Sequence, residues 1–295
     1  MKMFGVVAAL FSLALPAMAQ SDTAPINCTN CTAWNAPQKP FKVYGNSWYV
    51  GTHGLTSVLV TGPQGHILVD GALPQSAELI AANIKALGFK LQDVKFIVNS
   101  HAHWDHAGGI AALARMTGAT VVASAAGAWA MEHGTSPKDD PQYDAKHPDR
   151  IPKVAKVRVL ADGDAVKLGP LALTARFTPG HTPGGITWTW QSCEGGACKD
   201  LVFAESLNSI SSDGFFYSGG AGQPDVSARF RASIAKVDAL KCDIILSGHP
   251  DATDTFEKLA ASTPAHNAFV TTGDCHAYAE SAVERFDKRL VDEHK

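Results

Sequence analysis

The spacing of hydrophobic positions changes several times along the first half of the chain. Residues 42–51 and 57–71, KVYGNSWYVG and SVLVTGPQGHILVDG, are rich in β-branched and aromatic residues and are interrupted by turn residues. This pattern predicts an antiparallel meander of strands, with GPQG as a hairpin turn. Residues 76–89, SAELIAANIKALGF, have apolar residues at helical spacing, with Ser76 placed to cap the helix. The apolar run VKFIVNS, residues 94–100, then predicts a short buried strand.

Helical and strand patterns alternate in the next segment. Residues 108–118 predict a helix that ends at Gly118, residues 120–124 a strand, and residues 126–134 a short helix. Residues 134–152 are polar, contain several Pro and Asp residues and have no clear period. They predict a long loop, and such loops often border functional sites, so this loop is a candidate wall of a substrate site.

The second half of the chain repeats this arrangement. Strands are predicted within residues 157–177, 186–192 and 200–206, with the loop TPGHTPGG at 178–185. A helical pattern at 228–240 leads into the strand CDIILSGHP, which ends at His249, and the amphipathic tail at 275–295 predicts a surface helix. No short repeat interrupts the pattern, so we expect two intertwined αβ halves within a single domain over residues 20–295.

The first nineteen residues have the features of a secretory signal peptide. Lys2 gives a basic start, residues 4–15 are apolar, and Ala17-Met18-Ala19 forms a cleavage pattern before Gln20. The alternative is a membrane anchor, but the apolar run is short for a bilayer span. We therefore expect export to the periplasm, cleavage near Gln20 and no membrane attachment of the mature chain.

Composition places the chain of 295 residues among globular proteins, with 45% hydrophobic and 18% charged residues. The formal net charge is −3 and no Lys/Arg run occurs, so nucleic acid is not an expected partner. Six cysteines in an exported protein indicate disulfides. Spacing favours Cys28–Cys31, Cys193–Cys198 and Cys242–Cys275 among the fifteen possible pairings. A redox or zinc pair at Cys28 and Cys31 is the less favoured alternative.

Candidate chemistry is concentrated in residues 101–109, HAHWDHAGG, directly after the predicted strand at 94–100. On an extended chain His101 and His103 project to the same side and can reach one ion together. If the chain then turns into a helix, Asp105 and His106 point to a neighbouring position, and the two following glycines allow a tight bend. Four adjacent polar groups at a strand end are hard to explain as packing, so the motif predicts metal binding.

Imidazole nitrogen and carboxylate oxygen are ligands that suit zinc, and a catalytic zinc usually has three protein ligands and one open position. Two such ions need about six ligands, of which the motif provides four. His181 in TPGHTPGG and His249 in ILSGHP follow β-rich runs and supply the remaining two. Isolated histidines are more often hydrogen-bonded or surface residues than ligands. The histidines left unassigned are His53, His66, His133, His147, His266, His276 and His294.

HAHWDH, TPGHT and SGHP together resemble the motifs of the metallo-β-lactamase superfamily, and nearly the whole mature chain shares the resemblance. It implies a four-layer αββα sandwich with a dizinc site at one edge. His101, His103 and His181 would hold the first Zn²⁺, and Asp105, His106 and His249 the second. Ser206 occupies the serine position of subclass B3 enzymes. Glu205 precedes it where many relatives have aspartate, and we do not expect Glu205 to be a ligand.

The same resemblance implies hydrolysis of the β-lactam amide of penicillins, cephalosporins and carbapenems by a hydroxide that bridges the two zinc ions, and hence antibiotic resistance. Asp105 would orient the hydroxide and relay a proton, and Ser206 would hold water or the substrate carboxylate. Asn208 would bind that carboxylate, although a turn-forming Asn is an equal alternative. Gln142, with Tyr143, resembles a substrate-facing position.

Several other expectations remain open. Asp70 supports a zinc-bound histidine or only forms a turn, and Trp104 and Ile110 pack. Rival functions are a thioester, lactone or phosphodiester hydrolase of the same fold, or a non-catalytic zinc-binding protein. We expect a monomer that acts on a small molecule. The loops at 134–152 and 206–216 would determine which β-lactam classes are preferred.

Overall fold

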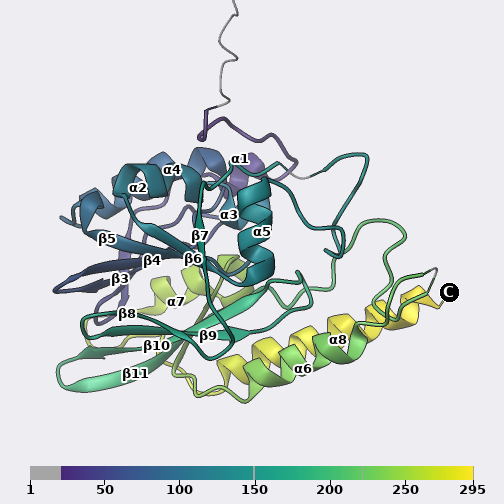
Figure 1. Cartoon of the computed structure of the whole chain (residues 1–295). Helices are drawn as coiled ribbons and strands as arrows, with labels where there is room; N and C mark the ends of the chain where they lie inside the picture. Colours follow the sequence, from purple (N-terminus) through teal and green to yellow (C-terminus); the bar gives the residue numbers. More distant parts are fainter. Residues whose placement is uncertain (1–20, 149, 221, 295) are drawn as a thin grey trace, which may run out of the picture.

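A computed structural model describes residues 21–148, 150–220 and 222–294. The expected signal peptide, residues 1–19, lies outside the described residues. Two β-sheets pack face to face and helices cover both outer surfaces (Figure 1), which confirms the expected αββα sandwich.

The first sheet contains seven strands in chain order. They are β1 (Phe41–Tyr44), β2 (Ser47–Tyr49), β3 (Val58–Gly62), β4 (Gly65–Val69), β5 (Val94–Val98), β6 (Thr120–Ala123) and β7 (Val157–Val159). Strands β1 to β4 pair antiparallel, which confirms the predicted meander, and Gly62 pairs with Gly65 across the β3–β4 turn. From β4 to β7 the pairing is parallel. The parallel strands direct their carboxyl ends to one edge.

The second sheet has five strands in the order β12-β11-β10-β9-β8. They are β8 (Ala165–Leu168), β9 (Leu171–Phe177), β10 (Ile186–Glu194), β11 (Ala197–Ala204) and β12 (Ile244–Ser247). Strands β8 to β11 pair antiparallel and β12 runs parallel to β11. The chain therefore leaves β11 and β12 at the same edge, immediately before Ser206 and His249.

Helices complete the outer layers (Figure 1). On the first sheet lie α2 (Ala77–Ala86), α4 (Ile110–Thr117) and α5 (Ala125–His133), and on the second α6 (Ser227–Asp238) and α8 (Asp274–Glu293). The shorter elements are α1 (Cys31–Trp34), η1 (Pro74–Ser76), η2 (Leu91–Asp93), α3 (Trp104–Ala107), η3 (Pro250–Thr253) and α7 (Thr255–Ala261). Helix α4 ends at Gly118, which adopts φ 75°, as expected from the sequence.

The predicted cap of α2 is wrong. Ser76 precedes the helix, but its side chain accepts no hydrogen bond from the helix and instead donates to Asn35 Oδ1 at 2.6 Å. The 3₁₀ turn η1 leads directly into α2 and gives Ser76 a helical backbone, so its hydroxyl cannot reach the first helical N–H groups. Ser124, which sequence reasoning did not select, caps α5 by accepting from the Gly127 N–H.

Three hydrophobic layers hold the sandwich together. One lies between the first sheet and its helices, one between the two sheets, and one between the second sheet and helices α6 and α8. Trp188, Phe203 and Tyr49 are fully buried in the layer between the sheets. Burial of each such side chain contributes about 1.5–3 kcal/mol or more, so the aromatic residues fix the distance and orientation of the sheets.

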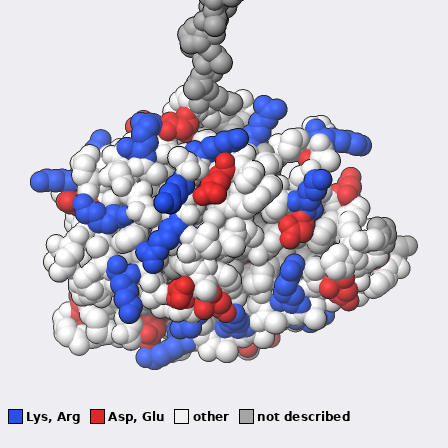
Figure 2. Space-filling model, viewed as in Figure 1, with Lys and Arg blue, Asp and Glu red and all other residues white. Residues whose placement is uncertain are grey.

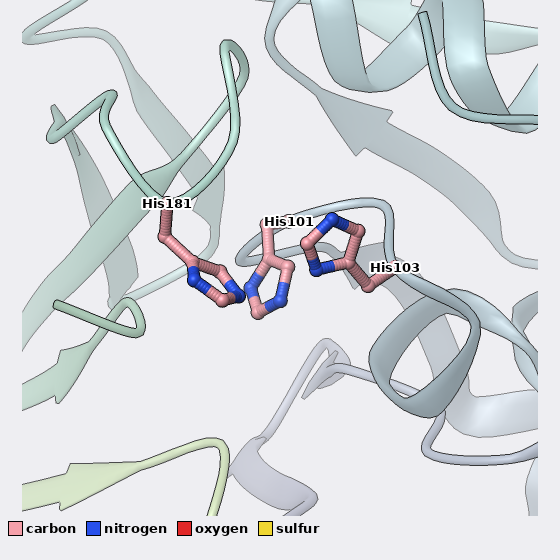
Figure 3. A group of neighbouring side chains, drawn as sticks. All are labelled: His101, His103 and His181. Atoms are coloured by element: carbon pink, nitrogen blue, oxygen red, sulfur yellow. The ribbon is translucent and has the colours of Figure 1, made fainter. Parts of the chain in front are cut away.

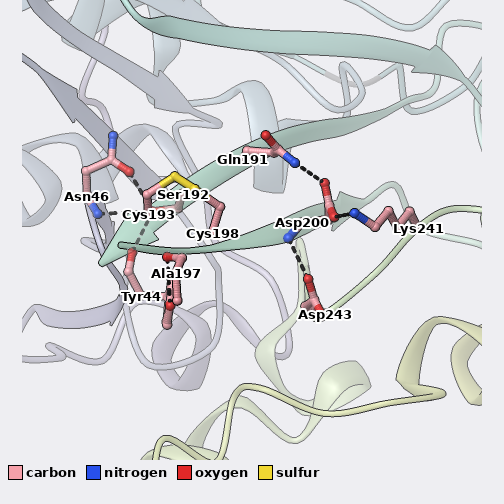
Figure 4. The surroundings of a disulfide bond; sticks show 10 residues. All are labelled: Tyr44, Asn46, Gln191, Ser192, Cys193, Ala197, Cys198, Asp200, Lys241 and Asp243. Atoms are coloured by element: carbon pink, nitrogen blue, oxygen red, sulfur yellow. Dashed lines mark hydrogen bonds and ion pairs between the residues drawn. A yellow bond between two sulfur atoms is a disulfide. The ribbon is translucent and has the colours of Figure 1, made fainter. Parts of the chain in front are cut away.

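All three expected disulfides are present: Cys28–Cys31, Cys193–Cys198 and Cys242–Cys275. Cys193 and Cys198 are cross-strand partners in the β10–β11 hairpin (Figure 4). Beside them, the Ser192 hydroxyl donates to the Tyr44 carbonyl at 2.9 Å and accepts from the Asn46 N–H at 3.0 Å. These bonds connect the hairpin of the second sheet to the β1–β2 turn of the first.

Basic and acidic side chains are interspersed over the face drawn in Figure 2. Within the described residues, no helix has both the length and the apolar character needed to cross a bilayer.

Candidate metal centre

The HAHWDH motif lies immediately beyond β5, where the chain passes from extended to helical conformation. His103 is extended, with φ −77° and ψ 155°, and α3 begins at the next residue. The His106 carbonyl accepts the Gly71 N–H at 2.8 Å, and the Gly109 N–H donates to the Ala72 carbonyl at 3.1 Å. A Cβ on Gly109 would lie 2.2 Å from the Gly71 carbonyl oxygen, so only glycine permits this close packing. The end of β4 thereby fixes the position of the motif.

Three buried imidazoles, those of His101, His103 and His181, face one another across a small space (Figure 3). Their ring centroids are 4.8–4.9 Å apart, and one ring nitrogen of each lies within 4.8 Å of the others. His181 comes from the loop between β9 and β10 and meets the other two rings from the opposite sheet. The two halves of the sandwich thus contribute jointly to one candidate site.

Asp105, His106 and His249 form a second group of ligand atoms within 4.8 Å of one another. The Asp105 Oδ2 atom is 3.4 Å from the Nε2 atoms of both His106 and His249. His249 follows β12, and Gly248 packs against the His106 ring so closely that a Cβ there would lie 2.4 Å from His106 Cε1. The structure therefore brings together all six residues that the sequence selected.

Two of the histidines, His103 and His181, have a hydrogen-bond partner for the ring nitrogen that faces away from their group, and a carboxylate lies near that nitrogen of His106. His103 Nε2 is 3.2 Å from Asp140 Oδ1, and His181 Nδ1 donates to the Asn208 carbonyl at 2.8 Å. His106 Nδ1 is 3.8 Å from Asp70 Oδ2. Partners of this kind fix the tautomer and orientation of a metal-bound imidazole. Asp70 thus lies where a supporting group is needed, and hydrogen bonds from Ser100 and Asn99 hold its carboxylate in place.

His101 differs from the other two histidines of the first group. Its Nε2 atom is buried and has no hydrogen-bond partner among the described residues. Its Nδ1 atom is 3.3 Å from Ser100 Oγ and 3.9 Å from Glu205 Oε1. A buried nitrogen without a partner is costly unless an ion occupies its lone pair, so this atom fits a metal ligand.

Burial and neighbouring charges together determine the protonation of this region. It lowers the pKa of His181 to about 3 and that of His101 well below its usual value, so both rings are neutral near pH 7. Burial alone would raise the pKa of Asp105, but His106 and His249 together hold it well below its ordinary range. Burial raises the pKa of Asp70 to about 6 despite the charge of His106. Neutral imidazoles and an ionised carboxylate are the ligand forms that a metal ion requires.

The expected substrate residues lie next to the two groups. Ser206, Asn208 and His249 line a cavity of about 590 Å³. The Gln142 side-chain nitrogen is 3.5 Å from His103 Nδ1 and 3.4 Å from His181 Nε2. The Ser212 hydroxyl donates to the Gln142 carbonyl at 2.8 Å, so the loops at 134–152 and 206–216 contact each other beside the site.

Sequence reasoning missed two residues of this region. Asp140, the partner of His103, lies in a polar loop without periodicity, so no local signal selected it. Trp34 packs on His249 with a ring-centroid distance of 5.2 Å and also contacts Trp104 at 5.9 Å. Trp104 is half-buried and Ile110 fully buried, in agreement with the packing roles expected for them.

Comparison with known proteins identifies related sequences and structures. The model of the metallo-beta-lactamase superfamily matches residues 50–249. MEM-A1, a subclass B3 metallo-beta-lactamase from a soil metagenome library, is 49% identical, with 88% of this chain and 98% of that chain covered and a TM-score of 0.85. The metallo-beta-lactamase SMB-1 bound to 2-mercaptoethanesulfonate is 50% identical, with coverages of 88% and 99% and a TM-score of 0.84. The Rm3 metallo-beta-lactamase is 47% identical, with coverages of 92% and 100% and a TM-score of 0.88.

The curated proteins that this chain resembles carry names other than β-lactamase. A hydroxyacylglutathione hydrolase of Anaeromyxobacter dehalogenans is 32% identical over 48% of this chain and 44% of that protein. The mitochondrial persulfide dioxygenase ETHE1 of Mus musculus is 30% identical over 41% of this chain and 37% of its own length. The chain thus spans less than half the length of either of these relatives.

Proposed function

The chain belongs to the metallo-beta-lactamase superfamily, and from this premise we propose that it is a zinc-dependent β-lactamase of the subclass B3 type. Its reaction would be hydrolysis of the amide bond in the β-lactam ring of penicillins, cephalosporins and carbapenems. The observation that carries the proposal is the convergence of two three-residue groups, His101, His103 and His181 with Asp105, His106 and His249. Metallo-beta-lactamase structures at 47–50% identity over nearly their whole length, among them the subclass B3 enzyme MEM-A1, support the choice of reaction.

The residues present fit two zinc ions. Each group offers three nitrogen or oxygen donors, the number that a catalytic zinc usually takes from protein. The buried, unpartnered Nε2 atom of His101 is the clearest sign that an ion belongs in the first group. Bound zinc would supply Lewis-acid polarisation of the lactam carbonyl and would make water nucleophilic near neutral pH.

The side chains around the two groups would bind and orient the substrate. Asp105 remains ionised near pH 7 and would accept a proton from the attacking water. Ser206 and Asn208 can donate hydrogen bonds to a substrate carboxylate from the wall of their shared cavity. Gln142 would contact the substrate from the opposite loop, since its amide already approaches the first histidine group.

A thioester hydrolase is the second candidate, because several curated relatives are hydroxyacylglutathione hydrolases. These matches extend over about half of the chain, whereas the metallo-beta-lactamase structures match about nine-tenths of it. The better coverage favours the β-lactam reaction.

Purified protein from Gln20 onwards tests the proposal. We expect hydrolysis of a carbapenem and of nitrocefin, loss of both activities with a chelator, and recovery when Zn²⁺ is added. A thioester and a lactone should be turned over poorly in the same assay. Chelator-insensitive turnover, or faster turnover of the thioester than of every β-lactam, would contradict the proposal.

We also propose that residues 1–19 direct export to the periplasm, where the enzyme would meet its substrate. Three disulfides among the described residues support an oxidising compartment. Amino-terminal sequencing of the protein from a periplasmic fraction should begin at or near Gln20, and sedimentation of that material tests the expected monomer.

A further inference from the structure

Glu205 is a fully buried acidic residue with no evident packing purpose. Neither oxygen of its carboxyl group has a hydrogen-bond partner among the described residues. Its backbone is held firmly, because its N–H donates to Thr187 Oγ1 at 3.2 Å and its carbonyl accepts from the Tyr278 hydroxyl at 3.0 Å. Burial of a carboxyl group without a hydrogen-bond partner destabilises a fold by about several kcal/mol. A buried carboxyl of this kind therefore indicates a functional role.

The surroundings of Glu205 direct its carboxyl group toward the first histidine group. Its Oε1 atom is 3.9 Å from His101 Nδ1. On another side lies the Gly185 backbone, where a Cβ would be 2.7 Å from Glu205 Cδ and Oε1. Glycine at that position gives the carboxyl room beside His101, and a larger residue would force it away.

The outer ring nitrogens of the other two histidines of the first group each face a carboxylate or carbonyl acceptor, whereas the hydrogen-bond partner of His101 Nδ1 is the Ser100 hydroxyl, at 3.3 Å. His103 has Asp140 at its outer nitrogen and His181 has the Asn208 carbonyl. We propose that Glu205 is a positioning residue for His101, an inference that rests on the proposed metal centre. Its carboxyl group accepts the Nδ1–H of His101, and this bond directs the lone pair of His101 Nε2 toward the first metal ion. The contact would shorten from its present length when that ion orients the ring.

Ser100 is the alternative acceptor, because its Oγ atom is 3.3 Å from the same nitrogen. That hydroxyl already donates its proton to Asp70 Oδ2 at 2.5 Å and belongs to the group of bonds that holds Asp70. If it were also the sole acceptor for His101, the Glu205 carboxyl would remain buried without any partner. Pairing with Glu205 satisfies both groups and is therefore favoured.

Three variants test this assignment. Glu205→Met removes the acceptor at similar volume, Glu205→Gln keeps a carbonyl oxygen that can accept the same N–H, and Ser100→Ala is the matched control at the rival acceptor. Zn²⁺ affinity of the metal-free proteins is measured by competition with a chromophoric chelator. We expect E205M to bind one of its ions about 10–100-fold more weakly. E205Q should recover most of that loss. S100A removes a bond that holds Asp70 beside His106, so its effect should fall on the second ion, while the His101 Nδ1–H stays hydrogen-bonded.

Two further measurements separate positioning from a structural role. Imidazole ¹⁵N NMR of the zinc-loaded protein should show a hydrogen-bonded Nδ1–H on His101 in the wild type and E205Q but not in E205M. Metal-free E205M should be at least as stable to urea as the wild type, because it removes an unpartnered buried carboxyl. Wild-type zinc affinity in E205M, a loss in E205Q as large as in E205M, or a loss confined to S100A would overturn the proposal.

These measurements use no β-lactam, so their outcome is distinct from that of the proposed reaction. A wild-type protein that binds Zn²⁺ in a Glu205-dependent manner but hydrolyses no β-lactam would refute the proposed function and leave this assignment in place. A protein that hydrolyses β-lactams but whose zinc affinity does not depend on Glu205 would refute this assignment and leave the proposed function in place.

Discussion

At the scale of single residues, the candidate centre depends on the difference between the two nitrogens of each imidazole. One nitrogen of His103 and one of His181 faces a protein acceptor, and the other nitrogen of each ring faces the rest of the first group. Asp105 is the only carboxylate among the six clustered residues. In the proposed reaction it would therefore perform proton chemistry that five imidazoles held as ligands could not.

Replacement of Asp105 by Asn should separate proton transfer from simple ligand support. Asp105→Asn keeps the side-chain volume but removes the charge, so we expect kcat for a β-lactam to fall by about 10²–10⁴-fold. Asp140→Asn is the control, because the Asp140 carboxylate faces the outer nitrogen of His103 and the Gln142 N–H rather than the space between the ligand atoms. This change should lower zinc affinity by about 10–100-fold. With saturating Zn²⁺, D140N should regain most of its kcat whereas D105N should not. Equal recovery of the two variants in steady-state kinetics would argue against a special role for Asp105.

At the scale of secondary-structure elements, the sequence pattern predicted correctly those strands and helix ends that depend on neighbouring residues. The meander of β1 to β4 and the end of α4 at Gly118 follow from turn residues and alternation within a few positions. Ser76 was interpreted wrongly because the 3₁₀ turn before α2 depends on packing rather than on a cap. Asp140 was missed for a related reason, since a loop reaches His103 through tertiary contacts that leave no periodic signal.

The disulfides cross-link these elements over very different lengths of chain. Cys242–Cys275 closes a separation of 33 residues and joins the start of β12 to α8, whereas Cys193–Cys198 closes a separation of five within one hairpin. On loop-closure entropy, the double variant C242S/C275S should lose about 4 kcal/mol of unfolding free energy and C193S/C198S about 2 kcal/mol. Urea denaturation of the two double variants provides a matched comparison. A larger loss in the hairpin variant would show that native-state contacts rather than chain entropy dominate.

At the scale of the whole molecule, the candidate centre lies where the two halves of the sandwich meet. His101 and His103 follow β5 of the first sheet, whereas His181 comes from the β9–β10 loop of the second. An ion held by all three would link the sheets and stabilise the folded state by mass action, by about 4 kcal/mol when free metal exceeds its dissociation constant 1,000-fold. Without the ion, the buried imidazoles of His101 and His181, whose pKa values burial lowers, make the fold sensitive to acid.

That sensitivity has a definite sign for His181. Its pKa is about 3 in the folded protein, against about 6.5 for an exposed imidazole. Between pH 6.5 and pH 3, His181 is protonated in the unfolded chain but neutral in the folded chain. The contribution of His181 to the free energy of unfolding is therefore lost as pH falls through this range. Burial raises the pKa of Asp70 to about 6, so Asp70 changes the stability in the opposite direction as pH falls. The pH dependence of the wild-type stability alone therefore does not isolate the effect of His181.

A comparison with His181→Gln removes this ambiguity, because the variant lacks the titrating ring and keeps Asp70. In the metal-free state, the stability of H181Q relative to the wild type should increase as pH falls from about 6.5 to 3, by up to about 5 kcal/mol. Urea denaturation in the presence of a chelator at several pH values measures this difference. Below the window the difference should level off, because both states of the wild type are then protonated. A difference that does not change with pH would mean that His181 is open to solvent, which is incompatible with the buried centre described above.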